Sequence, residues 1–426
     1  MIDRDSIALA RTALLIAATF VAAHVQAQAP RPPVRAGDWP QWRGPDRTGL
    51  SRETGLLKVW PPEGPRLVWR SPGRGGGYST PSVAAGRIYG MGYRGPEEVV
   101  WALDEATGRE VWATPIGPPA VGVGYNDGPR GTPTVDGDRL YAIGVGGTLV
   151  CLDAATGQLR WSRSLTRDFG GIRPNWGYSE SPLVDGDRLI VTPGGPTATM
   201  VALNRLTGEV IWVGVTPQRD RAQYASAIVA EVDGLRHYVQ FVSGGVIGMA
   251  ASDGRFLWRY DGPANGTANI STPIFWRNHV FAASAYQRGG GLVRLARTPT
   301  GIEATEVYFT RQMQNHHGGM VVVNDHLYGC DNQTLTCLEL ATGAVKWANR
   351  SVGKGSVAYA DGHLIVRSER GPVALVEARP DSYVEKGRFF QPERSARDAW
   401  PHPVIANGKL YLRDQDVLLC YDLKGQ

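Results

Sequence analysis

Short apolar runs separated by glycine-containing turns alternate along almost the whole chain. Asp-Gly or Asn-Gly pairs interrupt these runs at 136–137, 185–186, 361–362 and 407–408. Such pairs between apolar runs are strong signals for tight β-hairpins. Helical periodicity is nearly absent after the first thirty or so residues. The pattern therefore predicts many short antiparallel strands.

A second motif places a glycine four residues before a tryptophan. It occurs at Gly108 and Trp112, Gly157 and Trp161, Gly208 and Trp212, Gly254 and Trp258, and Gly343 and Trp347. An acid or amide and a threonine before the glycine can hydrogen-bond the backbone of a tight turn, and glycine supplies the positive φ. The tryptophan then lies on the next strand, where its ring can pack against a neighbouring sheet. The repeat predicts units of four short strands.

The fourth-strand aromatics give the number of units. They fall at Trp69, Trp112, Trp161, Trp212, Trp258, Tyr308, Trp347 and either Phe389 or Phe390. Spacings of 39 to 51 residues suit four-stranded propeller blades. The last unit has three strands and lacks a fourth. Residues 66–70 have the pattern of a fourth strand, but no first three strands precede them. We therefore expect residues 66–70 to pair with the last unit and close the ring. The sequence predicts an all-β, eight-bladed β-propeller of four-stranded antiparallel blades, with seven blades as the alternative.

The N-terminus has the pattern of a secretory signal. Basic Arg4 and Arg11 accompany a short apolar run that ends in small residues near Ala29, and the run is too short to span a bilayer. We predict a signal peptide over 1–29, a linker and lead-in segment over 30–63, and the propeller over 64–426. The expected product is a periplasmic or secreted monomer without a transmembrane segment. The net charge of +5 is not clustered, which argues against nucleic-acid binding.

The repeat resembles a known family. The pattern Ala-x-Asp-x-x-Thr-Gly-x-x-x-Trp is complete over 102–112 and resembles the tryptophan-docking motif of quinoprotein-type, or PQQ-like, propellers. The opening Asp-Trp-Pro-Gln-Trp-Arg-Gly at 38–44 resembles the start of secreted PQQ-like repeat proteins. The family includes PQQ (pyrroloquinoline quinone)-dependent dehydrogenases and non-catalytic propellers such as the outer-membrane assembly lipoprotein. The resemblance therefore implies the fold and leaves the function open.

Candidate binding residues lie where the longer connections lead into the innermost strands. We call the side that carries these connections the loop face, and the opposite side, which carries the tight hairpin turns, the turn face. The candidates around the channel mouth are Tyr78, Arg130, Asn175, Trp176, Tyr178, Glu180, Tyr224, Asn269, His316, His317, Lys354, Trp400 and His402. Arg130 and Lys354 can pair with carboxylates, and a tryptophan can stack on a flat ring. PQQ, a planar tricarboxylate, suits such a ring of residues, although every propeller must also line and solvate its channel.

The pattern of cysteines and of possible metal ligands argues against a PQQ-dependent dehydrogenase. Those enzymes carry adjacent cysteines and a Ca²⁺ ion held by carboxylates and amides, whereas no adjacent cysteines occur here. Calcium prefers six to eight oxygen ligands, and only Glu180, with Asn175 nearby, is well placed for it. His316 and His317 are adjacent, and adjacent strand residues point to opposite faces, so we predict no metal site there.

Three of the four cysteines, Cys151, Cys337 and Cys420, occupy one repeat position, which favours small buried residues over disulfides. Cys330 and Cys337 flank a hairpin and form the one pair that a disulfide could join. A catalytic thiol would need a partner base, and the sequence indicates none.

These observations favour an exported, non-catalytic binding or scaffold propeller that takes a protein or a small ligand on its loop face. The alternatives are a PQQ-dependent oxidoreductase of alcohols or sugars that uses PQQ with Ca²⁺, and a carbohydrate-binding propeller with Trp176 and Trp400 as stacking residues. No catalytic residue is assigned from the sequence.

Overall fold

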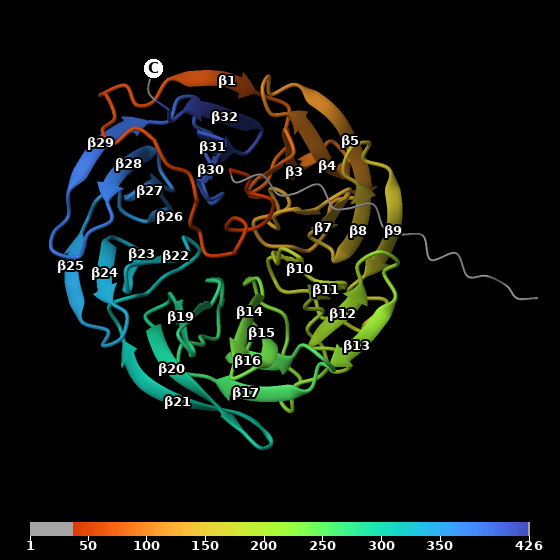
Figure 1. Ribbon diagram of the computed structural model, residues 1–426. Coiled ribbons are helices and arrows are strands. Elements are labelled where there is room, and N and C mark those ends of the chain that lie inside the picture. The colour runs from red at the N-terminus through yellow and green to blue at the C-terminus, as the bar shows by residue number, and fades with distance from the viewer. Residues whose placement is uncertain (1–36, 425–426) are drawn as a thin grey trace, which may run out of the picture. The chain divides into compact units, whose positions relative to one another are not determined.

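The computed structural model describes residues 37–424. The predicted signal peptide at 1–29 lies outside the described residues, as does the beginning of the predicted linker. The described residues contain thirty-two strands and no helix, and the strands form eight four-stranded antiparallel sheets. These sheets are the blades of a ring around a central channel (Figure 1). The eight-bladed prediction is confirmed, and the seven-bladed alternative is wrong.

Each of the first four blades takes its strands consecutively from the innermost to the outermost. Blade 1 contains β2 (Ser82–Ala84), β3 (Arg87–Arg94), β4 (Glu97–Asp104) and β5 (Glu110–Gly117). Blade 2 contains β6 (Thr134–Asp136), β7 (Arg139–Ile143), β8 (Thr148–Asp153) and β9 (Leu159–Ser164). Blade 3 contains β10 (Leu183–Asp185), β11 (Arg188–Val191), β12 (Met200–Asn204) and β13 (Val210–Gly214). Blade 4 contains β14 (Ile228–Val232), β15 (Leu235–Phe241), β16 (Val246–Ala250) and β17 (Phe256–Tyr260).

The next three blades repeat this order, and the eighth differs. Blade 5 contains β18 (Ile274–Trp276), β19 (His279–Ser284), β20 (Gly289–Thr298) and β21 (Gly301–Thr310). Blade 6 contains β22 (Met320–Val323), β23 (His326–Cys330), β24 (Leu335–Glu339) and β25 (Val345–Asn349). Blade 7 contains β26 (Gly355–Ala360), β27 (His363–Ser368), β28 (Pro372–Glu377) and β29 (Glu385–Phe390). Blade 8 contains β30 (Val404–Ala406), β31 (Lys409–Asp414), β32 (Val417–Asp422) and, from the start of the propeller, β1 (Leu67–Ser71).

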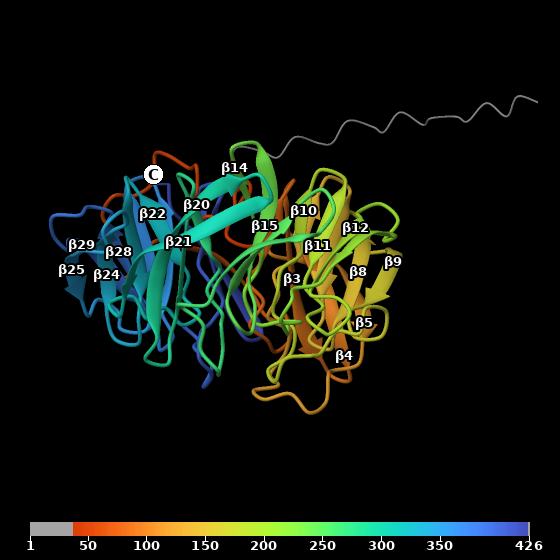
Figure 2. The same ribbon diagram turned by 90° about the horizontal axis from the view of Figure 1, so that it is seen from below.

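Blade 8 closes the ring by strand sharing, as predicted. Strand β1 pairs antiparallel with β32, and Trp69 lies opposite Cys420. The first and last strands of the propeller are thereby joined, which covers an edge that would otherwise be open to further pairing. Figure 2 shows the blades edge-on, with the long loop after β5 projecting from the loop face.

Tryptophans of the outer strands connect successive blades. The Nε1 atoms of Trp112, Trp161 and Trp212 donate hydrogen bonds to backbone carbonyls of the next blade at 3.2, 3.2 and 3.1 Å. Gly208 has a φ of 73°, and a Cβ atom there would lie 2.8 Å from the ring of Trp161. The repeat glycine is therefore required twice, for the turn conformation and for the close approach of a ring.

Blade 7 departs from the predicted pattern. In the other blades, the outer-strand aromatic lies beside a β-bulge, and in blade 7 Gly387 takes that position, opposite Leu375. The backbone and Cβ of Trp60 cover this glycine, because a Cβ on Gly387 would lie 2.6 Å from the Trp60 Cβ and 2.8 Å from its carbonyl oxygen. Phe389 packs against Trp60, and Phe390 is 72% exposed. Phe389 is nevertheless the outer-strand aromatic of blade 7, as one of the two predicted alternatives, because its ring packs on Gly64, just before β1 of blade 8, where a Cβ would clash with it.

Residues 37–63, called the lead-in segment below, cross the central channel near the turn face (Figure 1). Trp39 forms a β-bridge with Val83 of blade 1, and Leu50 forms one with Tyr359 of blade 7. Arg47 is buried and donates to the carbonyl oxygens of Ser181 and Pro182 at 2.6 and 2.9 Å. The segment therefore ties distant blades together from inside the ring.

The four cysteines are free and buried, so the disulfide considered between Cys330 and Cys337 is not formed. Cys151, Cys337 and Cys420 each lie opposite an outer-strand tryptophan, where a small residue leaves space for the ring. No helix within residues 37–424 is long and apolar enough to span a membrane.

Candidate functional site

A cavity of about 280 Å³ opens at the loop-face mouth of the channel. All eight blades contribute to it through the residues that lead into their innermost strands, and Trp42 of the lead-in segment adds a further wall. The sequence-predicted candidates that line this cavity are Tyr78, Arg130, Trp176, Tyr224, His316, His317, Lys354, Trp400 and His402. The repeat places these residues together because each precedes an equivalent strand.

Four predicted candidates do not line the cavity. Asn175 is exposed, and Tyr178 is buried with its hydroxyl donating to the Pro193 carbonyl at 2.8 Å. Asn269 is buried and donates to the Val242 carbonyl at 3.1 Å. Glu180 is also buried. Ser179, between Tyr178 and Glu180, lines the cavity instead, because neighbouring side chains point in different directions.

Glu180 has a structural set of partners. Its carboxylate accepts hydrogen bonds from Thr192 N at 2.7 Å, Thr192 Oγ1 at 2.8 Å and Gln240 Nε2 at 3.0 Å. Burial raises the pKa of Glu180 to about 7 in spite of these donors. Because this carboxylate is enclosed and Asn175 is exposed, the two residues do not assemble the oxygen-rich shell that Ca²⁺ requires. The residues proposed from the sequence therefore do not fit a calcium site.

The cavity walls are mainly aromatic. The rings of Tyr78 and Trp400 lie with centroids 4.3 Å apart, and those of Trp176 and Tyr224 lie 5.4 Å apart. Trp42 packs on His402 at 4.5 Å and donates from Nε1 to Thr272 Oγ1 at 2.8 Å. Trp42 was not among the residues predicted to line the channel mouth, although the tryptophan-rich opening at 38–44 was a signal for it.

Arg130 supplies a positive charge to the cavity. Its guanidinium lies 5.5 Å from the centroid of the Tyr78 ring and donates to the carbonyl oxygen of Tyr125 at 2.6 Å. Burial lowers the pKa of Arg130, but an arginine in this setting stays protonated at neutral pH. Within residues 37–424 it forms no ion pair with a carboxylate. An anionic group of a ligand could therefore pair with it.

Glu369 forms a second polar centre, which the sequence analysis missed. It follows β27 and accepts hydrogen bonds from His317 Nε2, Lys354 Nζ and Trp400 Nε1, the last two at 3.0 Å. Burial alone would raise the pKa of Glu369, but His317 and the Lys354 ammonium outweigh burial and lower it. No local motif marked Glu369, because its partners come from three other connections.

The adjacent histidines do not point apart as expected. Both rings line the cavity, and their centroids lie 4.8 Å apart. His316 and His317 lie in an irregular stretch before β22, so strand alternation does not apply to them.

Burial, together with the nearby His317 and Lys354, lowers the pKa of His316 to about 3, and burial next to Arg43 lowers that of His402 to about 3. Both imidazoles are neutral at physiological pH.

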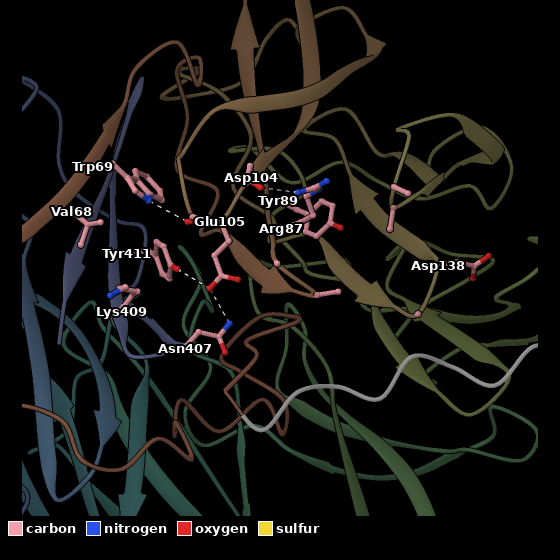
Figure 3. Close-up of a pocket in the computed structure, with 16 residues that line it drawn as sticks. Val68, Trp69, Arg87, Tyr89, Asp104, Glu105, Asp138, Asn407, Lys409 and Tyr411 are labelled. Carbon is pink, nitrogen blue, oxygen red and sulfur yellow. Dashed lines mark hydrogen bonds and ion pairs between the residues drawn. The ribbon is translucent and has the colours of Figure 1, made fainter. Parts of the chain in front are cut away.

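A larger hollow of about 790 Å³ lies on the turn face, between blades 8, 1 and 2 (Figure 3). Its polar groups pair with one another. Glu105 accepts hydrogen bonds from the Tyr411 hydroxyl at 3.0 Å and from Asn407 Nδ2 at 2.9 Å, and Arg87 pairs with Asp104 at 3.0 Å. This hollow is a seam between blades, whereas the loop-face cavity brings together aromatic rings and a cation.

Comparisons with known proteins agree on the architecture. A family profile described as outer membrane protein assembly factor BamB matches residues 96–349. BamB from Moraxella catarrhalis is similar with a TM-score of 0.59 and 16% identity, covering 85% of this chain and 98% of that one. Quinohemoprotein alcohol dehydrogenase from Comamonas testosteroni is similar with a TM-score of 0.64 and 12% identity, covering 92% and 81%. A comparison with curated proteins finds no match. At these identities the solved structures support the fold alone.

Proposed function

Because this chain belongs to the family described as outer membrane protein assembly factor BamB, we propose that it is an exported, non-catalytic propeller that binds a partner or ligand through its loop face. The family description names assembly at an outer membrane, which favours a periplasmic location. The signal-like residues 1–29 lie outside the described residues, so export rests on the sequence pattern and on the family.

The loop-face cavity is the observation that carries this proposal. It is lined by aromatic side chains from several blades, and it holds Arg130, which forms no ion pair with a carboxylate in the described part of the chain. Concave, largely apolar sites with a few convergent polar groups are typical of ligand binding. A flat group with a negative charge fits this combination best, because the rings can stack on its faces while Arg130 pairs with the charge.

A PQQ-dependent oxidoreductase is the second candidate. The same aromatic walls with Arg130 and Lys354 would suit a planar tricarboxylate. The residues expected to hold Ca²⁺ do not assemble, however, and Lys354 is already paired with Glu369 at 3.0 Å. These contacts favour binding without the metal-assisted oxidation.

Calorimetric titration of the purified mature protein tests the proposal. PQQ serves as the flat anionic probe, with and without Ca²⁺, and a neutral oligosaccharide serves as the uncharged probe. We expect PQQ to bind at micromolar affinity without needing Ca²⁺, and Arg130→Met to weaken binding about tenfold or more, as loss of a charge-assisted contact should. Arg109→Met, an exposed arginine on the turn face, is the matched control and should leave binding unchanged.

The other outcomes separate the candidates. Ca²⁺-dependent binding with dye-linked turnover would favour the oxidoreductase. Oligosaccharide binding that Arg130→Met leaves intact would favour a carbohydrate-binding propeller. In parallel, envelope extracts are passed over immobilised wild type, Arg130→Met and Arg109→Met. If no probe binds and no extract protein depends on Arg130, the loop-face proposal is wrong.

A further inference from the structure

At one wall of the loop-face cavity, two imidazoles that line it meet a buried carboxylate from another blade. His316 and His317 precede β22 of blade 6, and Glu369 follows β27 of blade 7. One ligand atom from each of these residues lies within 4.8 Å of the others. Glu369 is buried and the histidines are partly buried, so the group lies below the rim of the cavity.

The hydrogen bonds of the histidines leave one nitrogen of each ring unused. His316 Nε2 contacts the Tyr286 hydroxyl at 3.0 Å, and His317 Nε2 contacts Glu369. The Nδ1 atom of His316 is buried, has no hydrogen-bond partner among the described residues and is available to an ion, whereas His317 would bind through Nε2, which already contacts Glu369. A buried polar atom without a partner is costly, and in native proteins it calls for an explanation such as an ion.

We propose that His316, His317 and Glu369 bind one divalent transition-metal ion of the Zn²⁺ or Cu²⁺ class, with His317 Nε2 and Glu369 exchanging their hydrogen bond for the ion. Imidazole and carboxylate ligands suit these ions, whereas Ca²⁺ and Mg²⁺ require a shell of oxygens. Three protein ligands leave a coordination position open for a further ligand. The inference goes beyond the proposed function, because it concerns an ion and holds whichever organic ligand or partner the loop face takes.

Lys354 controls access to this site. Its ammonium lies 3.0 Å from Glu369 Oε1, where it neutralises the carboxylate and competes with an incoming cation. The Lys354 side chain is 27% exposed, so it can turn toward solvent when the ion binds. Removing its charge should therefore strengthen metal binding, while removing a ligand should weaken it. This pair of opposite effects is specific to the proposed site.

The test is a titration of tag-free mature protein with Zn²⁺ by calorimetry and with Co²⁺ by visible absorption. We expect one equivalent to bind, with the d–d bands of Co²⁺ in low coordination. His316→Ala with His317→Ala should weaken binding at least about a hundredfold, and Glu369→Gln about tenfold to a hundredfold. Lys354→Met should tighten it about tenfold, because a competing positive charge is removed. His326→Ala, a histidine on the turn face, is the matched control.

Circular dichroism and thermal melting establish that each variant is folded. If the double histidine variant does not fold, Glu369→Gln and Lys354→Met still give opposite predicted shifts. The inference is overturned if the wild type binds no ion, if the ligand variants retain wild-type affinity, or if Lys354→Met fails to tighten binding. The titration contains no organic ligand, so its failure leaves the PQQ-probe experiment untouched, and the reverse is also true.

Discussion

The two faces of the ring come from the same repeat but use their acidic residues in opposite ways. On the turn face, Asp104 accepts hydrogen bonds from Thr107 Oγ1 at 2.8 Å and from Thr107 N at 3.0 Å, and the Thr107 hydroxyl in particular lowers the pKa of Asp104. On the loop face, Glu98 is buried beside Val145, and burial raises its pKa to about 7. On the turn face, the Asp104 carboxylate stabilises a turn. On the loop face, the Glu98 carboxylate is enclosed, so its charged form is poorly solvated.

This contrast shows where the fold leaves room for binding. Turn-face hairpins are short and their motif is repeated, so a carboxylate such as that of Asp104 meets its partner within a few residues. Loop-face connections differ in length and sequence, and their polar atoms find partners in other blades or face the cavity. Stability should therefore respond most strongly to changes in the blade-to-blade contacts, and ligand binding to changes on the loop face.

The largest expected effect is at a blade contact. Trp212 is 7% exposed and donates from Nε1 to the Ala251 carbonyl at 3.1 Å. Trp212→Ala should lower the free energy of unfolding by about 3–5 kcal/mol, because it leaves a cavity over Gly254 and an unpaired carbonyl. Trp176→Ala on the loop face should cost less than about 1 kcal/mol and weaken PQQ-probe binding. Urea unfolding measures both variants, and equal losses of stability would contradict the contrast between the faces.

The second-largest loss of stability should follow from a substitution in the lead-in segment. Arg47→Met removes both donors to the Ser181 and Pro182 carbonyls, and two buried carbonyls without partners should cost about 3 kcal/mol. Thermal unfolding measures the loss, and limited proteolysis reports whether residues 37–63 have become accessible. Arg52→Met is the control, because its ion pair with Asp46 is exposed and should contribute less than about 0.5 kcal/mol. Resistance to protease equal to that of wild type would show that Arg47 does not anchor the segment.

A third prediction concerns pH on the loop face. The pKa of Glu98 is about 7 in the folded protein against 4.5 when unperturbed, so the folded state binds the proton more tightly than the unfolded state. The stabilisation from this proton is complete below about pH 4.5 and is lost as pH rises through 7, a change of about 3 kcal/mol. Glu98→Gln should flatten the profile of stability against pH over this range relative to wild type. Glu231→Gln, an exposed acid, serves as control, and parallel profiles for wild type and Glu98→Gln would refute the prediction.

The smallest expected effect concerns Asp104, whose contribution to stability should change with pH in the direction opposite to that of Glu98. The lowered pKa of Asp104 means that its contribution is present above about pH 4 and is lost as pH falls below that value. Asp104 is partly exposed, so solvent screening should hold the contribution below about 0.5 kcal/mol. Asp104→Asn should therefore reduce stability slightly at pH 7 and hardly at all at pH 3. Chemical unfolding at the two pH values measures this, and a larger loss at pH 3 would reverse the assigned sign.

Much of the fold could be predicted because its signals are local. A glycine such as Gly208 and a tryptophan four residues later report a turn and an outer strand without reference to the rest of the chain. The spacing of these motifs and the unpaired strand at 66–70 then indicated eight blades and a closed ring. The same regularity placed Tyr78, Arg130 and Trp400 around the cavity, since each leads into an equivalent inner strand.

The sequence by itself therefore determined the repeat, the ring and the face on which the candidate residues gather. Only the tertiary structure decided that Trp60 covers Gly387, that Trp42 lines the cavity, and that Glu369 meets the two histidines. These contacts join residues far apart in the chain; Trp42 and Thr272, for example, are separated by 230 positions. The physical reason is that a turn or strand is specified by neighbouring residues, whereas the partner of a side chain in a closed ring depends on how every blade packs.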